Sequence, residues 1–225
     1  MEQRRNRFII VLLIILSCVI MAVVEAVLAP GYRMKSLIKI VLFFLVPTVL
    51  LGRNKSFPLA ELFRIKGKRL SKSILLGVAV YGLILGAYFS IGSFFDFSQV
   101  AEAITSSSGV GREEFVWVAL YISFINSLLE EYFFRGIGFL MLGKVSSRRF
   151  AYLFSALLFA LYHIAIMSSW FSIYLFLLLM AGLFAAGFIF DWLNEKSGTI
   201  YQSWLVHMFA NFAINTIGFL LFGLI

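Results

Sequence analysis

The chain has 225 residues, of which 62% are hydrophobic and only 13% are charged, and its mean hydropathy is +0.98. A soluble domain usually carries roughly 25% charged residues, so this chain has too little polar surface to cover a water-soluble globule. The net charge of +8 does not indicate a nucleic-acid partner, because the Lys and Arg residues lie in short segments between apolar blocks, where they orient membrane helices.

Seven apolar segments follow one another along the chain, and each is expected to be a membrane-spanning helix. A spanning helix needs about 20 residues, and backbone in lipid must satisfy its own hydrogen bonds. The segments are Phe8–Ala29, Leu37–Leu51, Ile74–Phe95, Phe115–Leu142, Ala151–Met167, Trp170–Phe190 and Thr199–Leu224. Because the second and fifth are short, six to eight spans fit the sequence. The predicted fold is an all-α, polytopic transmembrane helical bundle of about seven helices.

The distribution of basic residues predicts the orientation of this bundle. Cytoplasmic loops of membrane proteins carry an excess of Lys and Arg. With the N-terminus in the cytoplasm, the segments assigned to the outside hold only Arg33, Lys35 and Arg112, and most other basic residues fall inside. Seven spans then place the C-terminus outside. The first apolar block is longer than the usual signal-peptide core of about 7–15 residues, so it is expected to remain as a helix.

Two connecting segments have a distinct composition. Arg53–Ser73 is basic and has apolar residues at helical spacing, such as Leu59 and Leu62, which predicts a segment on the cytoplasmic membrane surface. Phe95–Glu114 contains several serines and glycines and is expected to be a flexible outer loop that could act as a lid.

Ionisable residues inside the apolar segments are the most informative feature. Each costs about 2.5–3.5 kcal/mol on insertion scales, and such residues usually serve a function. Glu25 and Lys39 are expected to pair with each other between the first two helices or to extend towards the interface, and no chemistry is assigned to them. The single cysteine, Cys18, excludes an internal disulfide and a thiolate-based metal site.

The densest polar cluster lies in the fourth segment. Glu131 and Arg135 are four residues apart, so they share a helix face and are expected to form a supporting ion pair. Glu130 points about 100° away and has only Asn126 one turn earlier on its face. An unpaired carboxylate in a dry site suits a general base that works near neutral pH.

The fifth and seventh segments supply the two histidines of the chain. Phe159 and His163 are four residues apart, and His207, Asn211 and Asn215 follow each other at the same spacing. An imidazole and an amide that project together can stabilise an oxyanion, whereas Asn215 is expected to serve packing. At about 1.5 Å per residue, Glu130 and His163 both lie roughly 20 Å from the cytoplasmic end, so neighbouring helices would bring them to the same depth.

These residues resemble the CPBP family, which comprises the CAAX-protease and bacteriocin-processing (Abi-like) membrane proteins. The family pattern is Glu-Glu-x-x-x-Arg, then Phe-x-x-x-His, then His-x-x-x-Asn on separate helices. Here the three motifs are Glu130 to Arg135, Phe159 to His163 and His207 to Asn211, all intact and in order. They cover about Ser123–Asn215, and the first three helices carry no matching motif. Residues 1–112 are therefore expected to form N-terminal helices with a basic loop, and 113–225 a catalytic helical core.

The resemblance implies an intramembrane endopeptidase that acts near the cytoplasmic side of the membrane, and the compact chain with few loops favours a bacterial cell membrane. Glu130 and His163 would activate water, His207 and Asn211 would stabilise the oxyanion, and Glu131 with Arg135 would support the site. Glu130, His163 and His207 could bind zinc and leave one position for water. The His-Glu-x-x-His zinc motif is absent, and water activation without an obligatory metal is the favoured interpretation.

The expected partners are the lipid bilayer and a peptide or membrane-protein substrate, with no nucleic acid. A bacteriocin-like or signalling peptide suits a compact chain of this kind, and a CAAX-like protein is the other substrate class. The alternative function is bacteriocin self-immunity or a regulatory membrane scaffold without proteolysis. Buried charges also mark ion pathways, but the chain lacks the repeated halves of many transporters. The sequence does not indicate an oligomeric state.

Overall fold

The computed structural model describes residues 1–65, 70–98, 100–167 and 170–225. This described part is almost entirely helical and contains no strand. Six of its helices are long and apolar enough to cross a membrane. A further long helix runs without a break from Arg112 to Met141 and carries the charged cluster of the fourth segment. The predicted all-α membrane bundle of about seven spans is therefore confirmed.

The helices begin and end within several residues of the predicted limits. In chain order the elements are α1 (Glu2–Val23), η1 (Val24–Leu28), α2 (Tyr32–Ile40), η2 (Val41–Leu45), α3 (Val46–Leu51), η3 (Leu59–Phe63), α4 (Leu70–Ile91), η5 (Gly92–Phe94), α5 (Val100–Ser108), α6 (Arg112–Tyr121), η6 (Ile122–Asn126), α7 (Ser127–Glu130), η7 (Glu131–Met141), α8 (Arg148–Tyr162), α9 (Ile164–Met167), α10 (Ile173–Ser197) and α11 (Tyr201–Leu221). We call the continuous run α6–η6–α7–η7 the central helix.

Local sequence signals account for several of these boundaries. Ser147 caps α8, because its side chain accepts a hydrogen bond from the backbone N–H of Phe150. Gly198 ends α10 with a φ of 69°, a left-handed conformation that favours glycine. The π-helical η2 ends at Leu45, two residues before Pro47, which has no N–H to offer the preceding turn.

The two connecting segments differ from their predictions. The Phe95–Glu114 segment is not simply a flexible loop, because it contains the helix α5. In the Arg53–Ser73 segment, Leu59 and Leu62 are buried against the bundle as part of the 3₁₀ helix η3, so these two side chains face protein and not the membrane surface. Residues 66–69 of that segment lie outside the described part.

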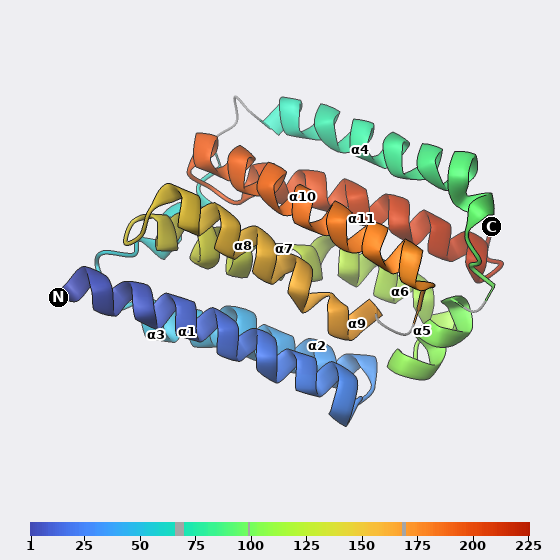
Figure 1. Cartoon of the computed structure of the whole chain (residues 1–225), viewed down its shortest axis with the longest axis horizontal. Helices are drawn as coiled ribbons and strands as arrows, with labels where there is room; N and C mark the ends of the chain where they lie inside the picture. The colour runs from blue at the N-terminus through green and yellow to red at the C-terminus, as the bar shows by residue number, and fades with distance from the viewer. Residues whose placement is uncertain (66–69, 99, 168–169) are drawn as a thin grey trace.

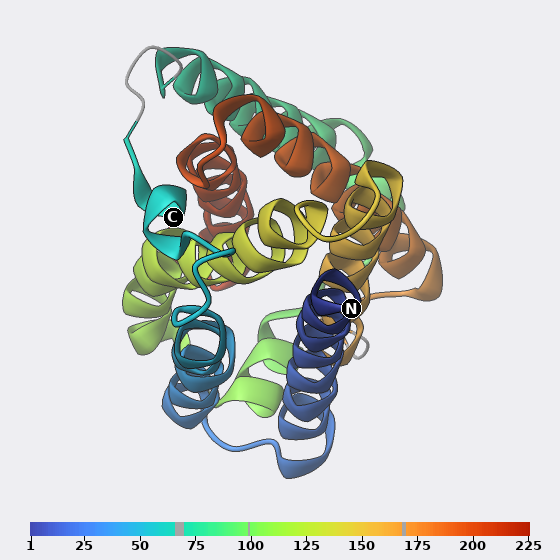
Figure 2. The ribbon, with the colours of Figure 1, turned by 90° about the vertical axis from the view of Figure 1, so that its left-hand side faces the viewer.

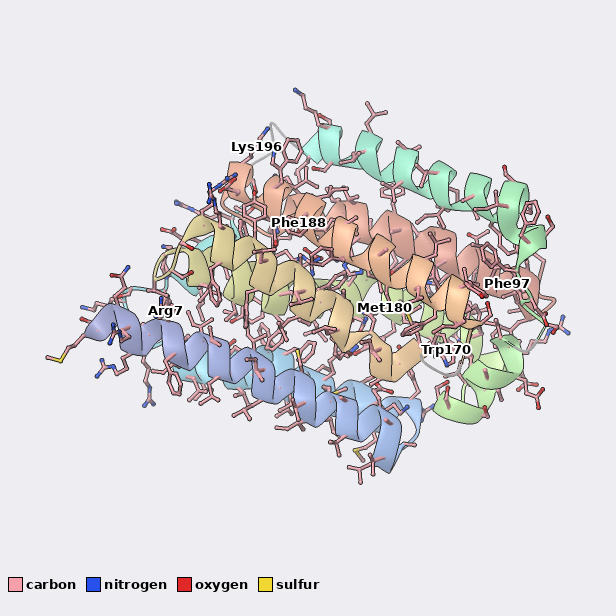
Figure 3. All side chains as sticks on the ribbon, viewed as in Figure 1. Arg7, Phe97, Trp170, Met180, Phe188 and Lys196 are labelled. Carbon is pink, nitrogen blue, oxygen red and sulfur yellow. The ribbon has the colours of Figure 1, made fainter. Side chains whose placement is uncertain are left out.

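The spans lie side by side, with the central helix inside the bundle. Figure 1 shows α1 with α2 and α3 along one edge, α4 along the other, and the two chain termini at opposite ends. The turned view in Figure 2 shows the central helix crossing between these groups, and it packs against α1, η2, α8, α10 and α11. Arg7 and Lys196 lie at the end where the chain begins, and Phe97 and Trp170 lie at the other (Figure 3).

Small residues allow the helices to approach closely. A Cβ atom added to Gly187 of α10 would lie 2.8 Å from both the Cα and the Cβ of Ala156 on α8. Close backbone approach of this kind is a common way for membrane helices to associate, because lipid removes the hydrophobic driving force between them. The α8–α10 contact places His163 and Asp191 beside the central helix, so it supports the site described below.

We predict that Gly187→Ala destabilises the protein, because its methyl group would meet the backbone of α8. The expected loss is about 1–3 kcal/mol, the usual cost of overpacking. Gly182→Ala is the matched control on the same helix, since a Cβ there meets nothing within 4 Å. Thermal unfolding in detergent should show a lower midpoint for the first variant alone, and equal midpoints would contradict this account of the contact.

Candidate active site

Glu130 is held by two polar side chains, one of which comes from the N-terminal half of the chain. Its Oε1 accepts a hydrogen bond from Asn126 Nδ2 at 2.9 Å and lies 3.3 Å from Lys39 Nζ. Lys39 in turn donates to Asn126 Oδ1 at 2.7 Å. Asn126 was expected to share the face of Glu130, but the expectation of an otherwise unpaired carboxylate is wrong. The pairing of Lys39 with Glu25 is also wrong, because Glu25 binds Lys35 at 2.7 Å.

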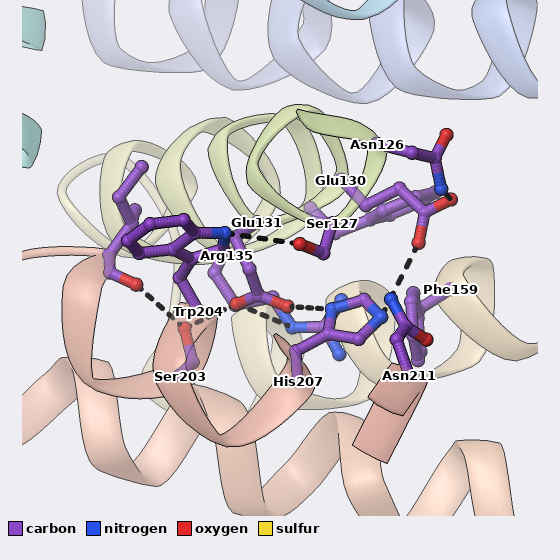
Figure 4. Close-up of polar contacts among 12 residues, drawn as sticks. Asn126, Ser127, Glu130, Glu131, Arg135, Phe159, Ser203, Trp204, His207 and Asn211 are labelled. Carbon is purple, nitrogen blue, oxygen red and sulfur yellow. Dashed lines mark hydrogen bonds and ion pairs between the residues drawn. The ribbon is translucent and has the colours of Figure 1, made fainter. Parts of the chain in front are cut away.

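Glu131 connects the central helix to α11. Its Oε1 lies 2.9 Å from Nδ1 of His207, and its Oε2 accepts a hydrogen bond from the Ser203 hydroxyl (Figure 4). The predicted pair with Arg135 is present at 3.8 Å between Nε and Oε2. With no exposed surface, this carboxylate orients His207 as well as balancing Arg135.

Arg135 is buried between a second carboxylate and aromatic rings. Asp191 of α10 lies 3.9 Å from its Nε, and Ser155 of α8 donates to Asp191 at 2.9 Å. The guanidinium carbon is 3.8 Å from the ring centroid of Phe159, a cation–π geometry. The sequence prediction missed Asp191, because it ended the sixth segment one residue earlier, at Phe190.

His163 lies at the end of α8, and a backbone contact sets its tautomer. Its Nδ1 is 2.7 Å from the carbonyl oxygen of Phe159, and because a carbonyl only accepts, Nδ1 carries the proton. Neutral His163 then has an unprotonated Nε2 that can accept a proton. His163 interacts electrostatically with Glu130, without a direct hydrogen bond between the two among the described contacts. The ring of Phe159 lies edge-on to both His163 and His207.

His207, Asn211 and Asn215 line one side of α11, as their spacing predicted. Nε2 of His207 faces Oε2 of Glu130 at 3.8 Å. Asn211 donates to the carbonyl oxygen of Ile122 at 3.2 Å, which holds its amide beside the central helix. Asn215 binds Ala119 and Ser123, so its contacts are those of a residue that packs helices together.

Three polar residues near the motifs were not assigned to the site from the sequence. They are Lys39, Asp191 and Ser203. Ser203 lies four residues before His207, on the side of α11 that carries His207 and Asn211, so helical spacing could have found it. It also contacts Asn194, whose Nδ2 is 2.6 Å from its hydroxyl oxygen. Lys39 was visible only as a charge in an apolar segment, because its partner lies on a distant part of the chain.

The described residues contain no group of three His, Cys, Asp or Glu side chains that could hold a metal ion. The ammonium group of Lys39 also places a positive charge 3.3 Å from Oε1 of Glu130, where a divalent cation would be repelled. The possible zinc ligands Glu130, His163 and His207 thus share their surroundings with a buried cation.

We predict that Ser203→Ala destabilises the protein, because Glu131 and Asn194 would each lose a buried hydrogen-bond partner. The expected cost is about 1–3 kcal/mol. Ser106→Ala is the control, since Ser106 is exposed and donates to the carbonyl oxygen of Ala103 within its own helix. Chemical or thermal unfolding in detergent measures the difference, and equal stability of the two variants would show that the Ser203 network contributes little.

Comparison with known proteins identifies the part of the chain that carries this site. Residues 112–213 match the family described as "Type II CAAX prenyl endopeptidase Rce1-like". No curated protein and no solved structure matches the chain. The matched region contains Glu130, Glu131, Arg135, His163, His207 and Asn211, the residues on which the CPBP resemblance rests. Residues 112–213 are thus similar to the Rce1-like family of type II CAAX prenyl endopeptidases, a match that implies a membrane endopeptidase.

Proposed function

We propose that this protein is an intramembrane endopeptidase in which Glu130 and His163 activate a water molecule. The observation that carries the proposal is how Glu130 is held. Asn126 and Lys39 both engage Oε1, so Oε2 is the oxygen that remains to accept a proton. Because the proton of His163 is on Nδ1, its Nε2 offers a second acceptor from a separate helix.

Proton transfer from water to Glu130 Oε2 or His163 Nε2 would leave a hydroxide that adds to the scissile carbonyl carbon. The C–N bond then breaks, and the stored proton passes to the leaving amine, so that one water is consumed for each peptide bond. Glu130 is 2% exposed, and little water competes with these groups in such a site.

His207 and Asn211 are the proposed oxyanion partners. In the protonated form, His207 donates from Nε2 while Glu131 accepts from Nδ1 and balances the charge. Asn211 uses one N–H for the carbonyl of Ile122, and an amide nitrogen has a second N–H to offer a substrate.

The proposed reaction needs no obligatory metal. The arrangement of the donors and the position of Lys39 support this, because the site already contains a buried cation beside its acidic group. We further propose that the N-terminus lies in the cytoplasm of a bacterial cell and that the substrate is a bacteriocin-like or signalling peptide, with a CAAX-like protein as the other class. The basic residues at the end where the chain begins support this orientation.

We predict that Glu130→Gln and His163→Ala abolish peptide cleavage by the purified protein, with a loss of at least about 10²-fold, as is usual for general acid–base groups. Glu25→Gln is the matched control, since Glu25 is another membrane-embedded glutamate but pairs with Lys35. Comparative peptidomics of cells carrying wild type or Glu130→Gln identifies the substrate. Unchanged turnover in both site variants would refute the peptidase and favour a self-immunity or scaffold role.

Extensive treatment with a zinc chelator should leave turnover unchanged, because the proposed base and oxyanion partners are side chains. The measurement is kcat on a peptide identified by peptidomics, before and after chelation, with a zinc protease in the same detergent as the positive control for chelation. Activity that is lost on chelation and restored by Zn²⁺ would contradict the metal-free proposal while leaving the peptidase assignment intact.

A further inference from the structure

Lys39 is a buried cation that reaches the candidate site from outside the matched domain. It lies on α2, whereas the family match begins at residue 112. Its side chain is only 10% exposed, and its ammonium group reaches the central helix. Lysine at this depth in a membrane bundle is rare and is usually retained for a function.

The polar contacts of Lys39 form a closed ring around one oxygen of Glu130. Nζ lies 2.7 Å from Asn126 Oδ1 and 3.3 Å from Glu130 Oε1, and Asn126 Nδ2 completes the ring at 2.9 Å. Asn126 alone could rotate about its side-chain bonds, whereas the Lys39 ammonium group holds both Asn126 and Glu130 in place. The carboxylate plane of Glu130 is therefore set by two donors, which directs Oε2 towards His207 at 3.8 Å.

The ammonium group of Lys39 also lies close to α8, the helix that ends beside His163. Its Nζ is 5.1 Å from the ring centroid of Tyr162, the residue that precedes His163. The ammonium group also interacts electrostatically with His163. Lys39 thus lies between the two helices that supply the proposed water-activating groups.

The distribution of charge gives each of the two adjacent carboxylates its own cation. Glu131 is balanced by Arg135 and by His207 when that ring is protonated, whereas Glu130 has Lys39 as its nearest permanent cation. Lys35, one turn earlier on α2, is occupied by Glu25 and by the backbone of Ser107. Lys35 cannot replace Lys39, and the two lysines have separate partners.

We propose that Lys39 is a positioning residue of the reaction, which fixes Glu130 so that Oε2 receives the proton of the attacking water. The inference rests on the proposed function. It means that the N-terminal helices complete the catalytic geometry, and that the matched domain alone would lack one of its charged groups.

The test compares three lysine variants of the full-length protein on a peptide that the wild type cleaves. We expect Lys39→Met to lower kcat about 10- to 100-fold with little change in KM, the usual effect of a misplaced catalytic group. Lys39→Arg should retain clearly more activity than Lys39→Met, because it keeps a cation that can reach the ring. Lys35→Met, the matched control, removes an equally buried lysine and should keep the wild-type kcat per folded molecule.

Folding is checked by size-exclusion chromatography and thermal unfolding in detergent, and Lys39→Gln replaces Lys39→Met if the latter does not fold. A Lys39→Met kcat within about twofold of wild type overturns the inference, as does an equal loss in the Lys39 and Lys35 variants. Failure of the proposed function looks different, because Glu130→Gln would then cleave as well as wild type. Loss in Glu130→Gln with full activity in Lys39→Met refutes only the role of Lys39.

Discussion

A charged group inside a membrane bundle must find a partner within the protein, since lipid offers none. Glu130 and Glu131 are neighbours in the chain, but the helix turns them towards different sides. Glu130 meets Lys39 and Asn126, and Glu131 meets Ser203 and His207. Two adjacent carboxylates thereby connect the N-terminal helices to the C-terminal ones through the central helix, and the same contacts that stabilise the bundle orient the candidate catalytic groups.

Aromatic rings give this polar network its dry surroundings. Phe159 contacts the guanidinium group of Arg135 on one side and lies edge-on to both histidines. Phe190 stacks on His207 at 5.3 Å between ring centroids. Rings at these positions exclude water without hydrogen-bonding to the polar groups, so the carboxylates and imidazoles interact mainly with each other.

The π-helical parts of the central helix also contribute to the site. In the π-helical η6, the carbonyl oxygen of Ile122 accepts from Asn211 and that of Phe124 accepts from Trp204 of α11. Such segments rearrange the local backbone hydrogen bonds and are frequent near functional sites. Here they join α11 to the central helix on both sides of His207, which restricts how far its imidazole can move relative to Glu130.

The sequence by itself determined the fold class and which residues of the candidate site share a helix face. Long apolar blocks require helices in lipid, and helical spacing placed Glu131 with Arg135 and aligned His207, Asn211 and Asn215. Only the tertiary structure decided which charged side chains on different helices form ion pairs. Lys39 could have paired with Glu25 as far as the sequence indicates, but the packing of α2 against the central helix brings it to Glu130 instead. Spacing describes one helix at a time, whereas ion pairs between helices depend on rotation and depth, which packing alone sets.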